Sequence, residues 1–105
     1  MREPSFLILT ALAGGSQHGY AILTDVSGIS AGRVRLHAGT LYAALERLQA
    51  DELVEVEREE VVDGRLRRYY RLSCQGEARL AAEASRLNAN ASAAIGRLRA
   101  AGATA

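Results

Sequence analysis

The chain has 105 residues and a formal net charge of +1, which fits one small domain and excludes a polycation that binds nucleic acid through overall charge. Any affinity for DNA must come from a local patch of arginine, because the 13 basic residues include no lysine. One Cys excludes an internal disulfide, and the N-terminal apolar run is too short to cross a bilayer. These features favour a soluble protein of the reducing cytoplasm.

The first predicted element is a helix over residues 3–15. Pro4 suits its first turn, and Gly14 and Gly15 suit its end. The helix is apolar on nearly every side, so we expect burial on more than one face, for which a small domain has few means without a partner chain.

A second helix is predicted over residues 16–28. Ser16 is its candidate cap, and one broad buried face is expected to hold Tyr20, Ile22, Leu23 and Val26. The segment 29–39 is rich in small residues and is predicted to be a connector that carries Arg33 and Arg35.

The stretch "GTLYAALERLQ", residues 39–49, begins the third predicted helix, which runs to about Glu52. Leu41, Leu45 and Leu48 form a single apolar stripe. The side chains of the first turn are small, polar and almost uncharged, as expected of a helix that enters a DNA groove.

Residues 54–72 change to the alternating period of strands. Asp63-Gly64 divides them and is a strong signal for a tight hairpin turn. A two-stranded hairpin is not stable alone, so this one must pack against the helices.

From Ser73 onward the pattern is helical again. An apolar seam with alternating spacings of four and three runs through Leu80, Ala84, Leu87, Ala91, Ala94 and Leu98. Nothing else in the chain is free to cover this seam, so we expect a homodimer.

The order of elements predicts a mainly α fold with a two-stranded β wing. Residues 1–73 are expected to form a winged helix-turn-helix DNA-binding domain, and residues 74–105 a C-terminal dimerisation helix.

Three blocks of the sequence, at residues 9–23, 32–55 and 63–80, resemble the PadR-type transcriptional regulators, in the short form with a single C-terminal helix. They carry HGY in the second helix, GTLY-x-AL in the third and GR-x-R-x-YY-x-L in the wing. The resemblance implies a dimeric DNA-binding repressor whose last and first helices form the dimer interface. In some members a hydrophobic cavity there binds aromatic or drug-like effectors.

The chain departs from the family pattern at several positions. Ala43 and Leu66 stand where the family usually has Pro, and His37-Ala38 replaces the usual Ser-Pro. The chain has no Trp, so the resemblance does not extend to effector binding between Trp rings.

The expected DNA-binding residues come from the connector, the third helix and the wing: Arg33, Arg35, Gly39, Thr40, Tyr42, Arg65, Arg67 and Arg68. Competing interpretations are a simple capping role for the Thr, packing for the Tyr, and cross-strand pairing of the wing arginines with the glutamates between 55 and 60. The expected dimer interface joins the seam to the first helix: Phe6, Leu9, Leu80, Ala84, Leu87, Ala91, Ala94 and Leu98.

Catalysis has no support in the sequence, which shows neither an activated nucleophile nor a phosphate-binding loop. We expect no metal and no cofactor, because His18 and His37 lack a plausible set of partner ligands. His18 is expected to pack or hydrogen-bond at the start of the second helix, and Cys74 to be inert.

The leading functional hypothesis is a homodimeric repressor of a pseudo-palindromic operator, released by a small apolar or aromatic effector. Two alternatives stay open: a winged-helix module that binds protein, and an effector-binding dimer whose DNA affinity is incidental. Placement of Arg33, Arg35 and Arg65 on one face would favour DNA.

Overall fold

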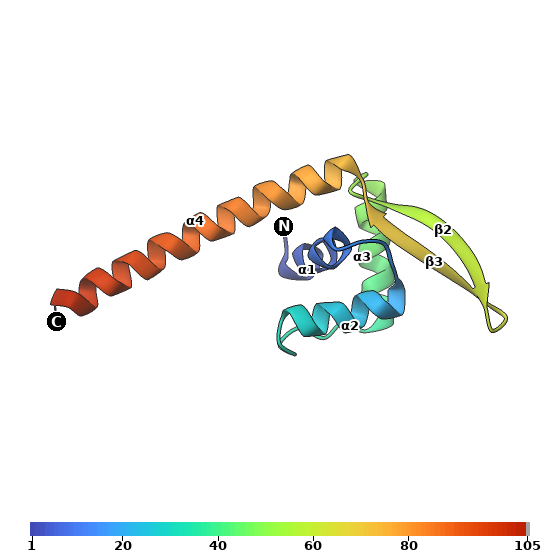
Figure 1. Ribbon diagram of the computed structural model, residues 1–105, viewed down its shortest axis with the longest axis horizontal. Coiled ribbons are helices and arrows are strands. Elements are labelled where there is room, and N and C mark those ends of the chain that lie inside the picture. Colours follow the sequence, from blue (N-terminus) through green and yellow to red (C-terminus); the bar gives the residue numbers. More distant parts are fainter. Residues whose placement is uncertain (105) are drawn as a thin grey trace.

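A computed structural model of the protein describes residues 1–104 and the side chains as far as residue 102. Three short helices pack together beside a hairpin, and a long helix extends away from them (Figure 1). The elements in chain order are α1 (Glu3–Ala13), β1 (Gln17–His18), α2 (Gly19–Ile29), α3 (Ala38–Ala50), β2 (Val54–Val62), β3 (Arg65–Leu72) and α4 (Cys74–Thr104). The predicted mainly α fold with a β wing and a long C-terminal helix is confirmed. Residue 105, the last of the predicted C-terminal helix, lies outside the described residues.

Helix α1 is buried on several sides, as its composition predicts. Leu7, Ile8, Leu9, Ala11 and Leu12 are all buried. The elements that bury them are α2, β3 and α4 of the same chain. The chain has one of the few means of burying such a helix without a partner, because the first turns of α4 fold back over it.

Helix α2 starts later than its sequence suggests. The predicted cap, Ser16, does not cap it; His18 does, accepting a hydrogen bond from the backbone N–H of Ala21 at Nδ1 over 3.4 Å. Tyr20 does not share the buried face of Ile22 and Val26 and is 75% exposed. Residues two apart on a helix point in different directions, so the prediction that Tyr20 and Ile22 share one buried face was wrong.

Helix α3 follows its predicted pattern closely. Leu41, Leu45 and Leu48 are buried, and Ala44 joins them. The other side of the helix is exposed along its length. The stripe therefore attaches α3 to the core and leaves its outer surface free.

The hairpin turn lies where Asp63-Gly64 predicts it. Both residues adopt the left-handed conformation, with φ of 51° and 75°, which suits a two-residue turn of the I′ type. The pairing register shifts between Val56 and Arg58, so the predicted alternation along β2 is interrupted by a bulge.

The wing is larger than the predicted two strands. Within residues 1–104 the sheet has three strands in the order β1-β3-β2, because Gln17 and His18 pair with Tyr70 and Tyr69. This short strand ties the start of α2 to the hairpin and holds the hairpin beside the helices.

Helix α4 begins in a close fit against the corner between α3 and β2. A Cβ atom on Gly76 would lie 1.9 Å from the carbonyl oxygen of Leu53, so only glycine fits there. Ser73 caps the helix, accepting a hydrogen bond from the Gly76 N–H at 2.9 Å. Beyond these turns α4 runs free of the helical core, and the side chains from Ala84 to residue 102 are exposed.

Candidate nucleic-acid interface

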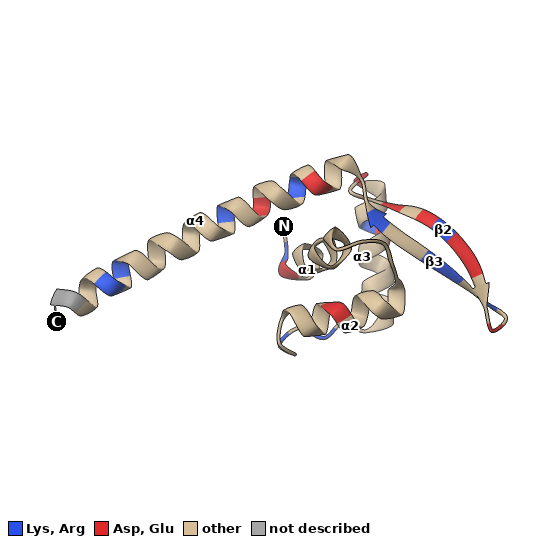
Figure 2. Ribbon diagram, viewed as in Figure 1, with Lys and Arg blue, Asp and Glu red and all other residues tan. Residues whose placement is uncertain are grey.

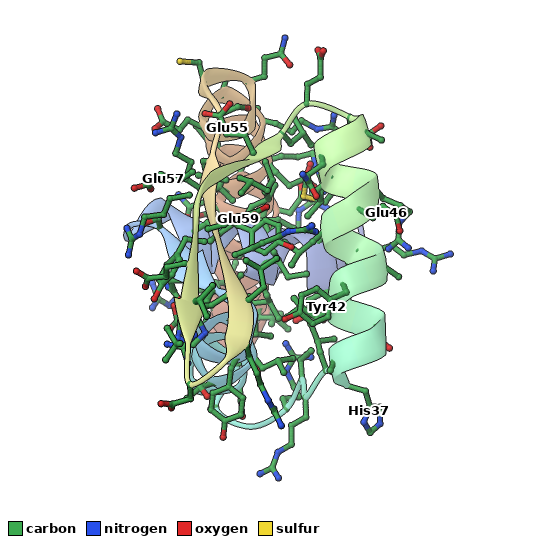
Figure 3. All side chains as sticks on the ribbon, turned by 90° about the vertical axis from the view of Figure 1, so that its right-hand side faces the viewer. His37, Tyr42, Glu46, Glu55, Glu57 and Glu59 are labelled. Carbon is green, nitrogen blue, oxygen red and sulfur yellow. The ribbon has the colours of Figure 1, made fainter. Side chains whose placement is uncertain are left out.

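A cleft separates the wing from the starts of α2 and α3. Its volume is about 510 Å³. It is lined by His18, Gly19, Tyr20, Tyr42, Val62, Asp63, Arg65, Leu66, Arg67 and Arg68. In Figure 3, Tyr42 extends from α3 toward the hairpin across this cleft. The cleft therefore brings the predicted wing arginines and the predicted tyrosine of α3 together.

Tyr42 rests directly on the start of α2. A Cβ atom on Gly19 would lie 2.3 Å from the Tyr42 hydroxyl oxygen and 2.8 Å from Cζ. Gly19 thus leaves room for the end of the tyrosine ring, while the side of the ring stays half exposed. This contact explains why a glycine stands between His18 and Tyr20.

The wing arginines differ in their ionic partners. Arg68 pairs with Glu59 at 3.0 Å on the neighbouring strand, whereas Arg65 and Arg67 form no ion pair within the described part of the chain. Figure 2 shows the division of charge, with acidic residues along β2 and basic residues along β3. The competing interpretation of cross-strand pairing therefore applies to Arg68 and not to the other two. Such exposed pairs contribute little free energy, so Arg68 can exchange its carboxylate for a phosphate.

The connector arginines separate from each other. Arg33 hydrogen-bonds the Glu3 carboxylate at the start of α1, and this contact lowers the pKa of Glu3. Arg35 lies beside α2 in a hollow that also includes Tyr20. The Arg35 guanidinium lies 3.4 Å from the position of a Cβ atom on Gly32, so it stays in the connector, and only Tyr20 lines both this hollow and the wing cleft.

The first turn of α3 is open to solvent. Gly39 and Thr40 are exposed, and no neighbouring heavy atom lies within 4 Å of a Cβ position on Gly39. The residue before the helix, His37, makes no side-chain capping bond in the described structure. The N–H groups of this turn are therefore available to a phosphate, which the positive end of a helix attracts.

His18 and Tyr20 belong to the cleft, although neither was among the predicted DNA-binding residues. The ring of His18 meets Tyr69 edge to face, with 5.5 Å between centroids. Burial, and then the charge of Arg67, lower the pKa of His18. The prediction that His18 hydrogen-bonds at the start of the second helix is confirmed. The HGY motif was the available signal for the cleft, but only contact with Tyr42 explains it.

The residues expected at a dimer interface fall into three groups. Leu9 is fully buried inside the protomer, so it has no surface left for a partner. Phe6 and Leu80 are partly buried against the core. The rest of the seam is exposed: Ala84, Leu87, Ala91, Ala94 and Leu98. Ile95, which the seam prediction omitted, is also 49% exposed on this helix.

The described residues show no group of three or more metal-binding side chains. Cys74 is exposed at the first position of α4. In the same part of the chain, no helix combines the length and apolarity that a membrane span requires.

Comparison with known proteins agrees with this geometry. The model of the transcriptional regulator PadR-like family matches residues 8–82, which include α1, the cleft and the start of α4. The chain is 52% identical over 46 residues to the transcriptional regulator Rv3488 of Mycobacterium tuberculosis, a match that covers 44% of this chain and 42% of that protein. The match thus spans less than half of that relative.

Two solved structures share the fold. A PadR family transcription regulator from Clostridium difficile R20291 superposes with a TM-score of 0.72 at 23% identity, over 85% of this chain and 91% of that one. Bacillus subtilis PadR in complex with operator DNA has a TM-score of 0.67 at 20% identity, over 75% of this chain and 45% of that one. From the family match over most of its length, together with the wing, the cleft and the long last helix, the chain belongs to the PadR-like family of transcriptional regulators.

Proposed function

We propose that the protein is a homodimeric transcriptional repressor that binds duplex DNA at a pseudo-palindromic operator in the cytoplasm and has no catalytic activity. The observation that carries the proposal is the cleft between α3 and the wing, where Arg65 and Arg67 lack ionic partners within residues 1–104. Unpaired guanidinium groups beside an exposed helix start are suited to the DNA backbone. Operator DNA bound to a protein of this fold supports the same assignment.

The alternative, a winged-helix module that binds protein, would suit scattered charges better. The three wing arginines instead line one cleft together with Tyr20 and Tyr42. The connector arginines lie apart from this cleft: Arg35 lines a separate hollow along α2, and Arg33 is held by Glu3. Three arginines and two tyrosines around one cleft, next to an open helix start, favour DNA over a protein partner.

The exposed seam of α4 supports dimerisation. Leu87 is 40% exposed and Leu98 72% exposed on a helix of 31 residues, and burial of such a stripe is the usual driving force for helix pairing. A two-fold dimer would present two α3 helices to successive major grooves, with half-sites about 34 Å apart.

A small apolar effector would fit at the base of α4. A hollow of about 540 Å³ lies between α1, β3 and α4, with Leu12, Leu80 and Ala84 among its lining residues. That volume is in the usual range for small-molecule sites. Planar aromatic compounds that act there should raise the melting temperature and weaken operator binding; a screen that leaves the melting temperature unchanged would exclude this control.

The DNA proposal is tested by a mobility shift with DNA from upstream of the protein's own gene, at several salt concentrations. Arg65→Ala should weaken binding to all sequences about equally and lower the salt slope by about one counterion per half-site. Thr40→Glu should fold normally and lose binding, because its carboxylate would face phosphate. Arg97→Ala, on the distant part of α4, is the matched control and should bind as the wild type does. Unchanged affinity and slope in Arg65→Ala would refute the role of the wing.

The dimer is tested by placing a charge on either side of α4. Leu87→Lys buries an ammonium in the proposed seam and should shift the sedimenting species from dimer to monomer. Ala89→Lys adds the same charge two residues further on, on the opposite side of the helix, and should remain dimeric. An intact, well-folded Leu87→Lys dimer would show that the seam faces solvent.

A further inference from the structure

The outer surface of α3 is formed by one line of residues. Gly39, Ala43, Glu46 and Ala50 are separated by four, three and four positions, so they lie on the same side of the helix. All four are exposed. The other three are glycine or alanine, and Glu46 is the one long, charged side chain on the line.

Hollows on both sides show which way this line faces. On one flank Tyr42 enters the wing cleft. On the other flank Arg47 lines a hollow of about 310 Å³ that it shares with Arg2 and Arg79. The line with Glu46 lies between these flanks and opposite the buried leucines. Figure 3 shows Tyr42 on the side of α3 toward the hairpin and Glu46 one turn further along the exposed part of the helix.

Small residues on this line allow the α3 backbone to approach the floor of a groove. Glu46 is about 10 Å further along the axis than Gly39, at a rise of about 1.5 Å per residue. A helix that lies along the major groove with its first turn against DNA would therefore bring Glu46 over a base pair about three steps further along.

The charge of Glu46 limits what it can contact there. Its carboxylate forms no ion pair with any residue that the structure describes, and it would be repelled by phosphate. In the major groove only the exocyclic amino groups of cytosine and adenine donate hydrogen bonds, and carboxylates pair best with cytosine N4. We propose that Glu46 is the residue of α3 that determines base specificity, by accepting a hydrogen bond from a cytosine amino group in each half-site.

This inference rests on the proposed DNA-binding function and is tested by selection of binding sites from a randomised duplex library. The wild type should enrich one cytosine position per half-site, with a discrimination of about 5- to 150-fold over the other bases. Glu46→Ala should lose the preference at that position and keep the others. Glu46→Gln should change the preference toward adenine, which a glutamine side chain pairs with through two hydrogen bonds.

Asp51→Asn is the matched control. It removes one negative charge at the other end of α3, outside the Glu46 line, and should leave the selected sequence unchanged. An identical cytosine preference in the wild type and Glu46→Ala would overturn the assignment of Glu46 while leaving the DNA-binding function intact. A wild type that binds no duplex at all would overturn both.

Discussion

Substitution of Gly19 by Ala separates the stability of the fold from the geometry of the cleft. The new methyl group would lie 2.3 Å from the Tyr42 hydroxyl oxygen, closer than any real contact, so the ring must move. The atoms in the way belong to the far end of a side chain that is 50% exposed, and they can rotate into solvent. The three heavy atoms nearest to the new methyl group all belong to the Tyr42 side chain, so the backbone of α2 need not move.

The expected costs differ accordingly. Because Ala is the better helix former, the free energy of unfolding should change by less than about 1 kcal/mol, and the melting temperature by no more than about 4 °C. We expect the Tyr42 hydroxyl, in its position beside Gly19, to donate a hydrogen bond to a DNA phosphate, and the displaced ring would lose that bond. A hydrogen bond to a charged group is worth about 1.5–3 kcal/mol, which corresponds to about a 10- to 150-fold loss of operator affinity per protomer.

Circular dichroism melting and a mobility shift on the same samples measure the two effects. Gly28→Ala is the control in the same helix, since no heavy atom lies within 4 Å of its Cβ position. In a Tyr42→Ala background, Gly19→Ala should have no further effect on binding, because the ring that it displaces is gone. If the Gly19→Ala protein binds DNA like the wild type, the position of the Tyr42 ring beside Gly19 does not determine binding.

Two further predictions concern stability. Gly76→Ala should lower the free energy of unfolding by about 3 kcal/mol, because its methyl group meets the backbone of Leu53 at 1.9 Å and no side-chain rotation relieves the clash. Denaturant unfolding measures this, with Gly96→Ala in the same helix as the control: nothing lies within 4 Å of its Cβ position, so it should be as stable as the wild type or more stable by up to about 1 kcal/mol. Folding lowers the pKa of His18 below its ordinary 6.5, so the folded state disfavours protonation: the stabilisation is complete above pH 6.5 and is lost as the pH falls through that value toward the folded pKa. The melting temperature of the wild type should therefore fall more between about pH 7.5 and pH 5 than that of His18→Asn, which keeps a capping side chain without the titration. Equal falls would show that folding does not shift the pKa of His18.

Local rules were sufficient for several elements. Asp63-Gly64 determined the turn, because few residue pairs tolerate two successive positive φ angles. The spacing of Leu41, Leu45 and Leu48 determined which side of α3 is buried. Each of these depends on residues close together in the chain, so the sequence by itself was enough.

Contacts between distant segments decided the rest. The start of α2 was mispredicted because Gln17 leaves the helix to pair with Tyr70. The prediction of Ser16 as the helix cap used only the residues next to it in the chain. Residues 17 and 18 instead pair with a strand more than fifty positions away, which the neighbouring sequence does not reveal.

The site shows the same division. The sequence placed arginines in the wing and the connector but could not show which were already paired: Arg33 meets Glu3, 30 residues earlier, while Arg65 stays unpaired within residues 1–104. Gly19 and Tyr42 were two separate motif residues in the sequence, and only packing of α2 against α3 made them one contact. Periodicity and turn chemistry act over a few residues, whereas ionic partners and close approaches depend on the path of the whole chain, so the tertiary structure decided which predicted residues line the cleft.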